Sequence, residues 1–432
     1  MRDDSVLYWI WLSERCGVAS KEFGRLAEKY DDPFDLYRLE EEEIEHLEGI
    51  SEGIKTKLCD KALESSYAIL RYCRENKVDI ITYGDKRYPE RLKRIETPPV
   101  LLYCLGRFPD FNTRLCIGIV GTRKMSEYGK QSAYKISYEL SAAKTVIVSG
   151  MALGIDAVAA CGALEASGDT VAVLGCGISV VYPKEHKKLM RSITSFGAVI
   201  TEYSPTEEPN ARNFPKRNRL ISGLCQGVVI VEGDQRSGAL ITASRAISQG
   251  REVFALPGKI DESNSDGPNE LIRNGAHVAL SSDDILNFYD FLYHGSIYYK
   301  GHTKAKKKEL DVDRALAKYG VSDIYYRGRY RKDDSKSFEA EEVKVDKAKP
   351  YGTVKEKPPI EAVPREDNSE EVLSALDPKS RIVFEHMPID KAVAVDALVD
   401  TGLPSNDILT AFTMLELSGL IQALPGGLYL RK

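Results

Sequence analysis

The feature that most constrains the fold is a regular alternation of two kinds of segment between about residues 80 and 290. Amphipathic stretches of helical length separate most of a series of short apolar, β-branched runs, which lie at residues 115–120, 145–148, 171–174, 199–201, 228–231, 253–256 and 277–280. Such alternation is typical of βαβ units, which build a parallel sheet with helices on both faces. We therefore predict an α/β domain with a Rossmann-like, doubly wound parallel sheet.

The residues before this alternation have a helical pattern. Apolar side chains such as Leu7, Ile10, Phe23 and Leu26 recur at helical spacing, which predicts an N-terminal helical domain. Within it, residues 47–54 resemble the turn of a helix–hairpin–helix or SAM-like module, where backbone N–H groups can meet a phosphate. The acidic residues at positions 40–48 would repel that phosphate, so we favour a packed helical module over a DNA contact.

The residues after the alternation divide into two parts. Residues 296–370 mix basic and acidic runs with prolines and offer little that could build a core, which favours a charged, flexible linker; aromatic residues at 319–330 could still dock. Further on, apolar spacing predicts helices near residues 382–387 and 393–398 and a third that begins after the N-cap Ser405.

A hairpin at residues 420–430 completes this last part, and three helices followed by a hairpin are typical of a winged-helix domain. The predicted domains are an N-terminal helical domain at 1–78, a Rossmann-like domain at 79–295, a linker at 296–370 and a winged-helix domain at 371–432.

Composition limits the classes of function. The 432 residues are too many for one ordinary core, and the net charge of −5 excludes a uniformly basic surface, so any phosphate-binding surface must be local. No CxxC pair occurs among the eight cysteines, which we interpret as small buried hydrophobes rather than metal ligands or a disulfide frame. No apolar run approaches the roughly 18 residues that a membrane span needs, so we expect no membrane segment and a cytoplasmic location.

The turns that follow the predicted strands are rich in small residues. In an open α/β sheet, ligands bind beyond the carboxyl ends of the strands, where helix N-termini present N–H groups. One such turn is weak evidence because glycine also serves tight turns, but several turns at one edge together with Arg123 favour a phosphate site. The residues predicted to bind phosphate in these turns are Gly121, Thr122, Arg123, Ser149, Gly150, Ser237, Gly238 and Thr242. No GxGxxG motif with a following ribose-binding acid occurs, so we expect no dinucleotide cofactor.

A second signal is the basic run at residues 212–219. Pro215 suits the first position of a helix, which would place Lys216 and Arg217 in its opening turn. Cations there oppose the helix dipole at a cost of up to about 1 kcal/mol each, and no acid lies within the run. We therefore favour a polyanion over a solvated helix start as the partner of Lys216, Arg217, Asn218 and Arg219. Phe214 is well placed to stack a base, although it could equally anchor the core.

Three other polar positions need an interpretation. Lys184 lies in a smaller basic patch and joins the predicted site, whereas its neighbour His186 has no catalytic or metal-ligand spacing. Asp156 is expected to cap or complement a helix N-terminus. Glu232 could accept a hydrogen bond from a sugar hydroxyl or orient Arg236, and the residues alone do not separate these two roles.

Taken together, these motifs resemble those of the DprA (Smf) family of DNA-processing proteins. The resemblance is specific over roughly residues 80–285 and looser for both ends, and its motifs are Gly121-Thr122-Arg123 and residues 149–156, 214–223 (FPKRNRLISG), 237–242, 255–258 and 269–276. Two small departures are Thr122, where serine is usual, and His186, where asparagine is usual.

The resemblance implies a function that the residues alone do not show. A protein of this family would bind single-stranded DNA, protect incoming DNA, form a homodimer and load the RecA recombinase during natural transformation and homologous recombination. The positions that match the family's DNA-binding pocket are Arg123, Phe214, Lys216, Arg217, Asn218 and Arg219.

Two other classes of function are a nucleotide-processing enzyme and a regulator that reads duplex DNA. Related Rossmann-like enzymes process nucleotides with a catalytic glutamate, but aligning their turn with residues 238–242 puts Arg245 at that position, which favours a binding protein over an enzyme. A duplex-reading regulator would need cations in its winged helix. No Lys or Arg lies between Lys391 and Arg431, so we predict that this domain contacts protein instead.

Deletion of residues 370–432 should therefore leave the affinity for oligonucleotides nearly unchanged. The physical reason is that the deleted domain lacks the cations that neutralise phosphates. Fluorescence anisotropy with a labelled oligonucleotide checks this, and a large loss of affinity in the truncated chain would contradict it.

Overall fold

The computed structural model describes residues 3–290, 292–293 and 311–321, and parts of residues 377–431. The chain forms two compact units, residues 1–353 and residues 354–432, and each is described by itself.

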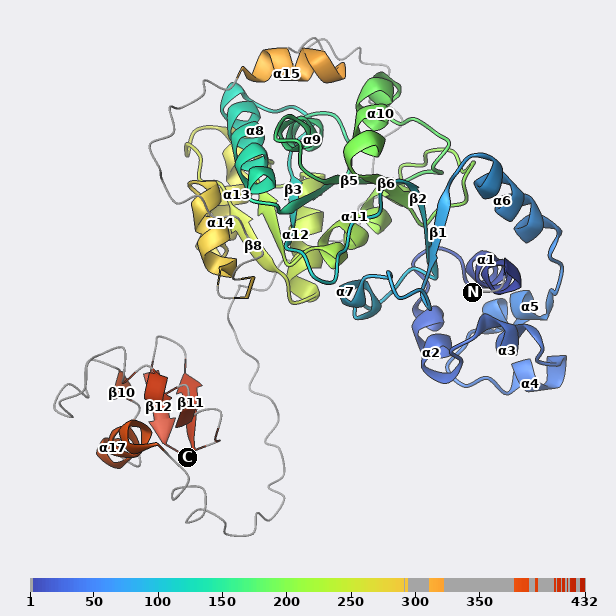
Figure 1. Ribbon diagram of the computed structural model, residues 1–432, viewed down its shortest axis with the longest axis horizontal. Coiled ribbons are helices and arrows are strands. Elements are labelled where there is room, and N and C mark those ends of the chain that lie inside the picture. The colour runs from blue at the N-terminus through green and yellow to red at the C-terminus, as the bar shows by residue number, and fades with distance from the viewer. Residues whose placement is uncertain are drawn as a thin grey trace. The chain divides into compact units, whose positions relative to one another are not determined.

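The first unit begins with six helices. Ser20 caps α2 by accepting a hydrogen bond from the Phe23 N–H, and Asp32 caps α3, whose first residue is Pro33. Ile50, from the turn between α4 and α5, and Ile54, in the first turn of α5, are buried in the core of this helical domain, as a packed module requires. The helices, drawn in blue in Figure 1, are α1 (Asp3–Cys16), α2 (Lys21–Lys29), α3 (Pro33–Tyr37), α4 (Glu41–Glu45), α5 (Glu52–Cys59) and α6 (Glu64–Glu75).

A sheet of nine strands follows, and it confirms the predicted fold class. All seven predicted strands are present, and they run parallel to one another. Two strands at one edge, β1 (Asp79–Thr82) and β2 (Leu101–Gly106), were not predicted and pair antiparallel. The parallel strands are β3 (Cys116–Val120), β4 (Val146–Ser149), β5 (Thr170–Val173), β6 (Ala198–Thr201), β7 (Gly227–Ile230), β8 (Glu252–Ala255) and β9 (His277–Val278).

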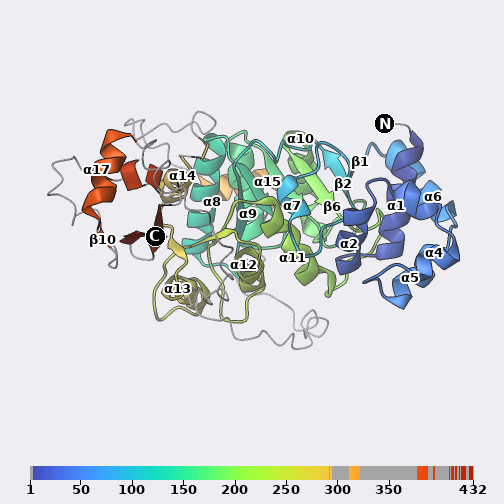
Figure 2. The ribbon, with the colours of Figure 1, turned by 90° about the horizontal axis from the view of Figure 1, so that it is seen from below.

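Helices cover both faces of the sheet (Figures 1 and 2). On one face lie α8 (Glu127–Ala142), α9 (Ile155–Glu165) and α10 (Lys187–Phe196), and on the other lie α11 (Asn213–Leu224) and α12 (Gly238–Ser248). The remaining elements of the domain are α7 (Glu90–Lys93), α13 (Asp266–Arg273), α14 (Ser282–Tyr289) and the short 3-10 helices η1 (Lys184–His186) and η2 (Ser263–Ser265).

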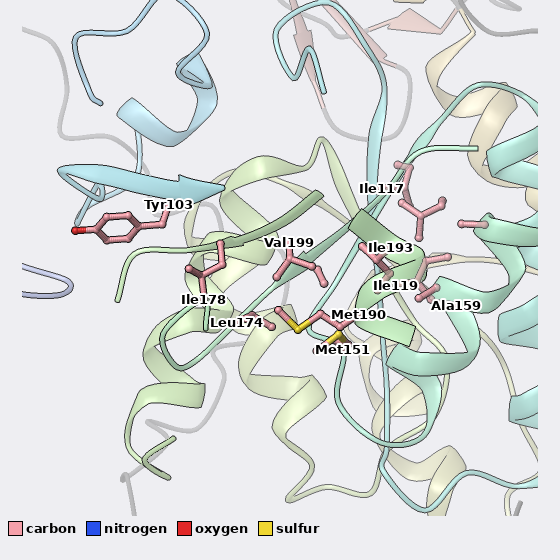
Figure 3. Close-up of a cluster of buried hydrophobic side chains, with 14 of the residues drawn as sticks. Tyr103, Ile117, Ile119, Met151, Ala159, Leu174, Ile178, Met190, Ile193 and Val199 are labelled. Atoms are coloured by element: carbon pink, nitrogen blue, oxygen red, sulfur yellow. The ribbon is translucent and has the colours of Figure 1, made fainter. Parts of the chain in front are cut away.

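The cores on the two faces follow from strand geometry. Successive side chains of a strand point to opposite faces, so Ile117 and Ile119 of β3 pack with α9 and α10, whereas Cys116 and Val120 pack with α11 and α12. Figure 3 shows the first of these cores, where Ile193 of α10 lies among apolar side chains of the sheet and its loops. Because both faces are buried, the strands are continuously apolar rather than alternating.

The strand order places a switch point beside β3. The order is β1-β2-β6-β5-β4-β3-β7-β8-β9, so the chain proceeds from β3 to β6 in one direction and then continues from β7 on the other side of β3. The helix after β3, α8, and the helix after β7, α12, cover opposite faces (Figure 1). In sheets of this kind, the space beyond the carboxyl ends of the two strands at the switch point is the usual place for a ligand.

One helix lies within the residues that the sequence predicted to be a flexible linker. Within residues 296–370, α15 (Val312–Tyr319) buries Val312, Ala315, Leu316 and Tyr319 in the core that contains α9 and α10. Lys130 Nζ lies 2.7 Å from a carboxylate oxygen of Asp313, and the Tyr319 hydroxyl donates to Glu165 at 2.8 Å. Charge composition indicated a linker, but the apolar positions of this short stretch lie on one helical face.

The second unit contains a helix, α17 (Pro378–His386), and a small antiparallel sheet of β10 (Val393–Ala394), β11 (Ile421–Leu424) and β12 (Leu428–Arg431). The predicted hairpin is confirmed, and the rings of Phe412 and Tyr429 stack with centroids 4.1 Å apart. The helix predicted at residues 393–398 was wrong at its start, because Val393 and Ala394 pair with β12. Ser405, the predicted N-cap, lies outside the described residues.

Replacing Leu316 with alanine should weaken the docking of α15 by about 2 kcal/mol or more, because Leu316 is only 2% exposed. Faster hydrogen exchange or proteolysis confined to residues 311–321 would measure the effect. Arg314→Ala is the matched control on the exposed side of the same helix. Equal exchange in wild type and Leu316→Ala would show that α15 is not held by its apolar face.

Candidate nucleic-acid interface

The loops that carried the predicted site lie at one edge of the sheet, because the strands before them are parallel. At the switch point, the loop after β3 is joined to the loop after β7 by a hydrogen bond from the Thr122 N–H to the Glu232 carbonyl (2.7 Å). The Thr122 carbonyl accepts from the Ile155 N–H at the start of α9 (3.2 Å). Gly154 has φ = 82°, and a Cβ there would collide with the Thr122 backbone, so glycine is required for this closure. Arg123 projects from the loop as an exposed side chain.

Phe214 lies at the centre of this edge. Its ring is half-buried, with the guanidinium of Arg123 6.0 Å from its centroid and that of Arg217 at 5.9 Å. Tyr182, from the loop after β5, packs against it with ring centroids 5.3 Å apart. Gly175 lets the ring approach, since a Cβ on this residue would be 2.9 Å from Phe214 Cδ1. The arrangement is an aromatic surface bordered by cations, which suits a base and its phosphates.

The buried side chain of Arg217 supports the loops around the Phe214 ring. Its guanidinium, in a side chain only 4% exposed, donates to the carbonyls of Gly150 (3.0 Å) and Val173, which end β4 and β5. Asp156 supplies the opposite charge and accepts from the Gly150 N–H at 3.0 Å. Burial raises the pKa of Asp156, and the positive charge of Arg217 limits that rise. A Cβ on Gly150 would be 2.5 Å from Arg217 Nη2, so glycine makes room for the guanidinium.

Arg219 has a partner within the protein, whereas the sequence, with no acid inside the basic run, favoured a polyanion. Arg219 forms a buried ion pair with Glu202, the first residue after β6. Burial raises the pKa of Glu202, and Arg219 opposes the rise together with a backbone hydrogen bond from Ala19 of the helical domain. α11 also begins earlier than predicted, at Asn213, so that Pro215 is its third residue and Lys216 and Arg217 follow the first turn.

The predicted site residues therefore differ in accessibility. Ser149 donates its hydroxyl to the Ile119 carbonyl at 2.8 Å and the Gly150 N–H is bonded to Asp156, so these two groups support the loops rather than face outward. Gly121, Thr122, Phe214, Asn218 and Ser237 are half-buried; the exposed residues are Arg123, Lys184, Lys216 and Gly238, and the buried residues are Ser149, Gly150, Arg217, Arg219 and Thr242. Asn218 joins two helices, because its amide donates to the Gly238 carbonyl at 3.4 Å.

Glu232 has a role that the sequence did not suggest. Its buried carboxylate accepts from both the N–H (2.9 Å) and the hydroxyl of Ser126, the N-cap residue of α8. It therefore complements the N-terminus of α8. Gly129 is required opposite it, since a Cβ there would collide with the carboxylate.

Two other side chains complete the surroundings of the site. His186 is buried and its Nδ1 lies 2.9 Å from the Met151 carbonyl; burial lowers its pKa, which agrees with a structural role. Tyr182 was not predicted as a site residue, although an aromatic residue in the loop between β5 and η1, two residues before Lys184, was a usable signal. Among the described residues, no group of three His, Cys, Asp or Glu side chains is placed to hold a metal ion, and no helix is long and apolar enough to cross a membrane.

Comparison with known proteins places this doubly wound α/β protein among the DNA-processing proteins. The sequence model of the family described as DNA recombination-mediator protein A matches residues 79–290, and that of the DprA winged helix domain matches residues 361–427.

The relatives include the DNA processing protein DprA of Bacillus subtilis (strain 168), 39% identical over 218 residues, or 50% of this chain and 73% of that protein. DprA of Streptococcus pneumoniae (strain ATCC BAA-255 / R6) is 42% identical over 212 residues, or 48% and 73%. The X-ray structure of DprA from Streptococcus pneumoniae matches with a TM-score of 0.57 and 34% identity, over 65% of this chain and 97% of that chain. This chain therefore belongs to the DprA (Smf) family of DNA processing proteins.

Replacement with alanine should destabilise the protein strongly at Arg217 and hardly at all at Lys216. Arg217→Ala would leave the buried carboxylate of Asp156 without its counter-charge and should lower the free energy of unfolding by about 3–5 kcal/mol. Lys216→Ala removes an exposed side chain and should change it by less than about 0.5 kcal/mol. Urea unfolding measures both, and a mild effect of Arg217→Ala would contradict the supporting role assigned to this residue.

Proposed function

We propose that this protein binds single-stranded DNA at the interface centred on Phe214, without sequence preference and without chemical turnover. The observation that carries the proposal is the half-buried Phe214 ring between the guanidinium groups of Arg123 and Arg217, with exposed Lys216 on the same helix. Aromatic stacking combined with cations along the backbone is how proteins hold single strands without reading bases.

The geometry of the ring favours single strands over duplexes. A base in a duplex is stacked and paired on both sides, so it reaches a protein ring only after it leaves the helix, at a cost of a few kcal/mol. Phe214 is half-buried between Gly175, Tyr182 and the two arginines, so only an unstacked base could approach it. An unpaired strand offers such bases without that cost.

The surrounding carboxylates favour binding over catalysis. At this edge of the sheet, within the described part of the chain, Asp156 faces Arg217, Glu202 pairs with Arg219 and Glu232 complements α8. Each carboxylate is held by protein groups, which does not suit a general base that must reach a substrate. The alternative, a nucleotide-processing enzyme of a related Rossmann-like family, would need one of them to be released.

Membership of the family supports a cellular role in recombination. The family's description names a DNA recombination mediator, and we propose that this chain protects incoming single strands and loads the RecA recombinase on them during natural transformation, in the cytoplasm.

A homodimer is part of this proposal. Ile260, Val278 and Leu280 are 95%, 43% and 76% exposed; Val278 belongs to the edge strand β9, and the other two lie in loops next to β8 and β9. A second copy would cover these apolar side chains.

Binding should be tight, stronger for single strands and steeply dependent on salt. Arg123→Ala and Lys216→Ala should each weaken binding and reduce the magnitude of the log–log salt slope by about 0.7, since each removes one phosphate contact. Phe214→Ala should weaken binding by about tenfold or more, because one stacked base is worth about 1–3 kcal/mol. Fluorescence anisotropy on single- and double-stranded oligonucleotides measures these effects, with Arg71→Ala of α6 as the control for an exposed arginine elsewhere.

Equal affinity of wild type, Arg123→Ala and Lys216→Ala would remove the proposed interface. Incubation with nucleoside monophosphates tests the enzymatic alternative directly, and release of free base would contradict a protein that only binds.

A further inference from the structure

A row of cations leads away from the proposed interface along one helix. The exposed side chains of Lys184, Lys187, Lys188 and Arg191 lie on η1 and α10 at intervals of three or four residues, which places them on one face. The opposite face of this segment is buried through Leu189, Met190 and Ile193, the last two of which Figure 3 shows in the core. The cationic face is therefore held outward by the packing of the apolar face.

Within the described part of the chain, no acidic side chain neutralises these four cations. Among the residues that the structure describes, none of the four forms an ion pair, and Glu185 is the one acid within the row. The first turn of α10 contains Lys187 and Lys188 and no acidic residue. Cations at this end oppose the helix dipole, so their placement does not stabilise the helix. A polyanion bound from solution would neutralise these cations and would explain why cations lie in the first turn of α10.

The row is continuous with the interface at Phe214. Lys184 follows two residues after Tyr182, whose ring packs against Phe214, so their Cα atoms are within about 8 Å of each other. From Lys184 the row extends about 10 Å along the segment to Arg191. Gly320, next to the end of α15, packs against the stem of Lys188, where an added Cβ would be 3.2 Å from Lys188 Cβ. This contact restricts the first part of the Lys188 side chain.

We propose that Lys184, Lys187, Lys188 and Arg191 form a second segment of the DNA-binding surface, which takes the phosphates of the nucleotides next to those held at Phe214. This inference rests on the proposed function and adds to it a direction for the strand, over the N-terminal half of α10. The segment contributes charge and no stacking surface, so it lengthens the bound strand without adding base preference.

The test compares two lengths of labelled oligothymidylate by anisotropy over a range of salt concentrations. One, of about 5 nucleotides, fills the Phe214 interface alone, and one of about 20 also reaches α10. In the full chain, combined Lys187→Gln, Lys188→Gln and Arg191→Gln should reduce the magnitude of the salt slope for the longer strand by about 2, at 0.7 for each phosphate. The shorter strand should bind as it does to wild type.

A matched variant removes the same charge elsewhere. Lys57→Gln, Arg71→Gln and Lys135→Gln replace exposed cations of α5, α6 and α8 and should leave the slope for the longer strand near that of wild type. An unchanged slope in the α10 variant, or an equal loss in both variants, would overturn the proposal. A duplex of about 20 base pairs serves as a third probe, and a loss confined to it would overturn the proposal too, because the row would then serve another ligand.

Failure of this inference is distinguishable from failure of the proposed function. Arg123→Ala should weaken both lengths, because it acts at the Phe214 interface; if it weakens neither, the proposed function fails whatever the α10 variant does. Since the α10 cations are exposed, thermal unfolding of the variant should match wild type. If the triple variant does not fold, Arg191→Gln alone should still reduce the slope by about 0.7.

Discussion

The buried guanidinium of Arg217 is the interaction on which the candidate interface depends. A charge removed from water is costly unless it is paired and hydrogen-bonded, and Arg217 meets both conditions through Asp156 and the carbonyls that end β4 and β5. Because those carbonyls belong to the sheet, Arg217 ties the start of α11 to the ends of two strands. Phe214 lies one helical turn before Arg217, so its ring is positioned by the same contact.

Burial divides the basic run at residues 212–219 into two kinds of cation. Lys216 is exposed and can contact a phosphate. The charges of Arg217 and Arg219 are instead neutralised inside the protein, by Asp156 and Glu202 respectively. Only a cation that no protein carboxylate already neutralises adds net positive charge for a phosphate ligand. The same division explains how a chain with a net charge of −5 presents a local surface for a polyanion: exposed cations lie at the edge of the sheet and along α10, while Asp156, Glu202 and Glu232 are buried and bonded to protein groups.

Much of the fold was predictable because it follows from local patterns. The parallel strands were recognisable as short apolar runs, since a strand buried on both faces has no polar positions. The edge strands β1 and β2 were missed because they pair antiparallel outside the alternation of strands and helices. The helix α15 was missed because the charges around it masked four apolar positions that are buried against distant helices.

For the site, the amino-acid sequence by itself determined that small-residue turns and Arg123 meet at one edge, because parallel strands end together. It also determined membership of the DprA family, through motifs that need no coordinates. Only the tertiary structure decided which cations face outward, that Glu232 complements α8, and that Phe214 lies between Arg123 and Arg217. The physical reason is that burial and pairing depend on residues far apart in the chain, such as Arg217 with Gly150 and Val173, which no local pattern brings together.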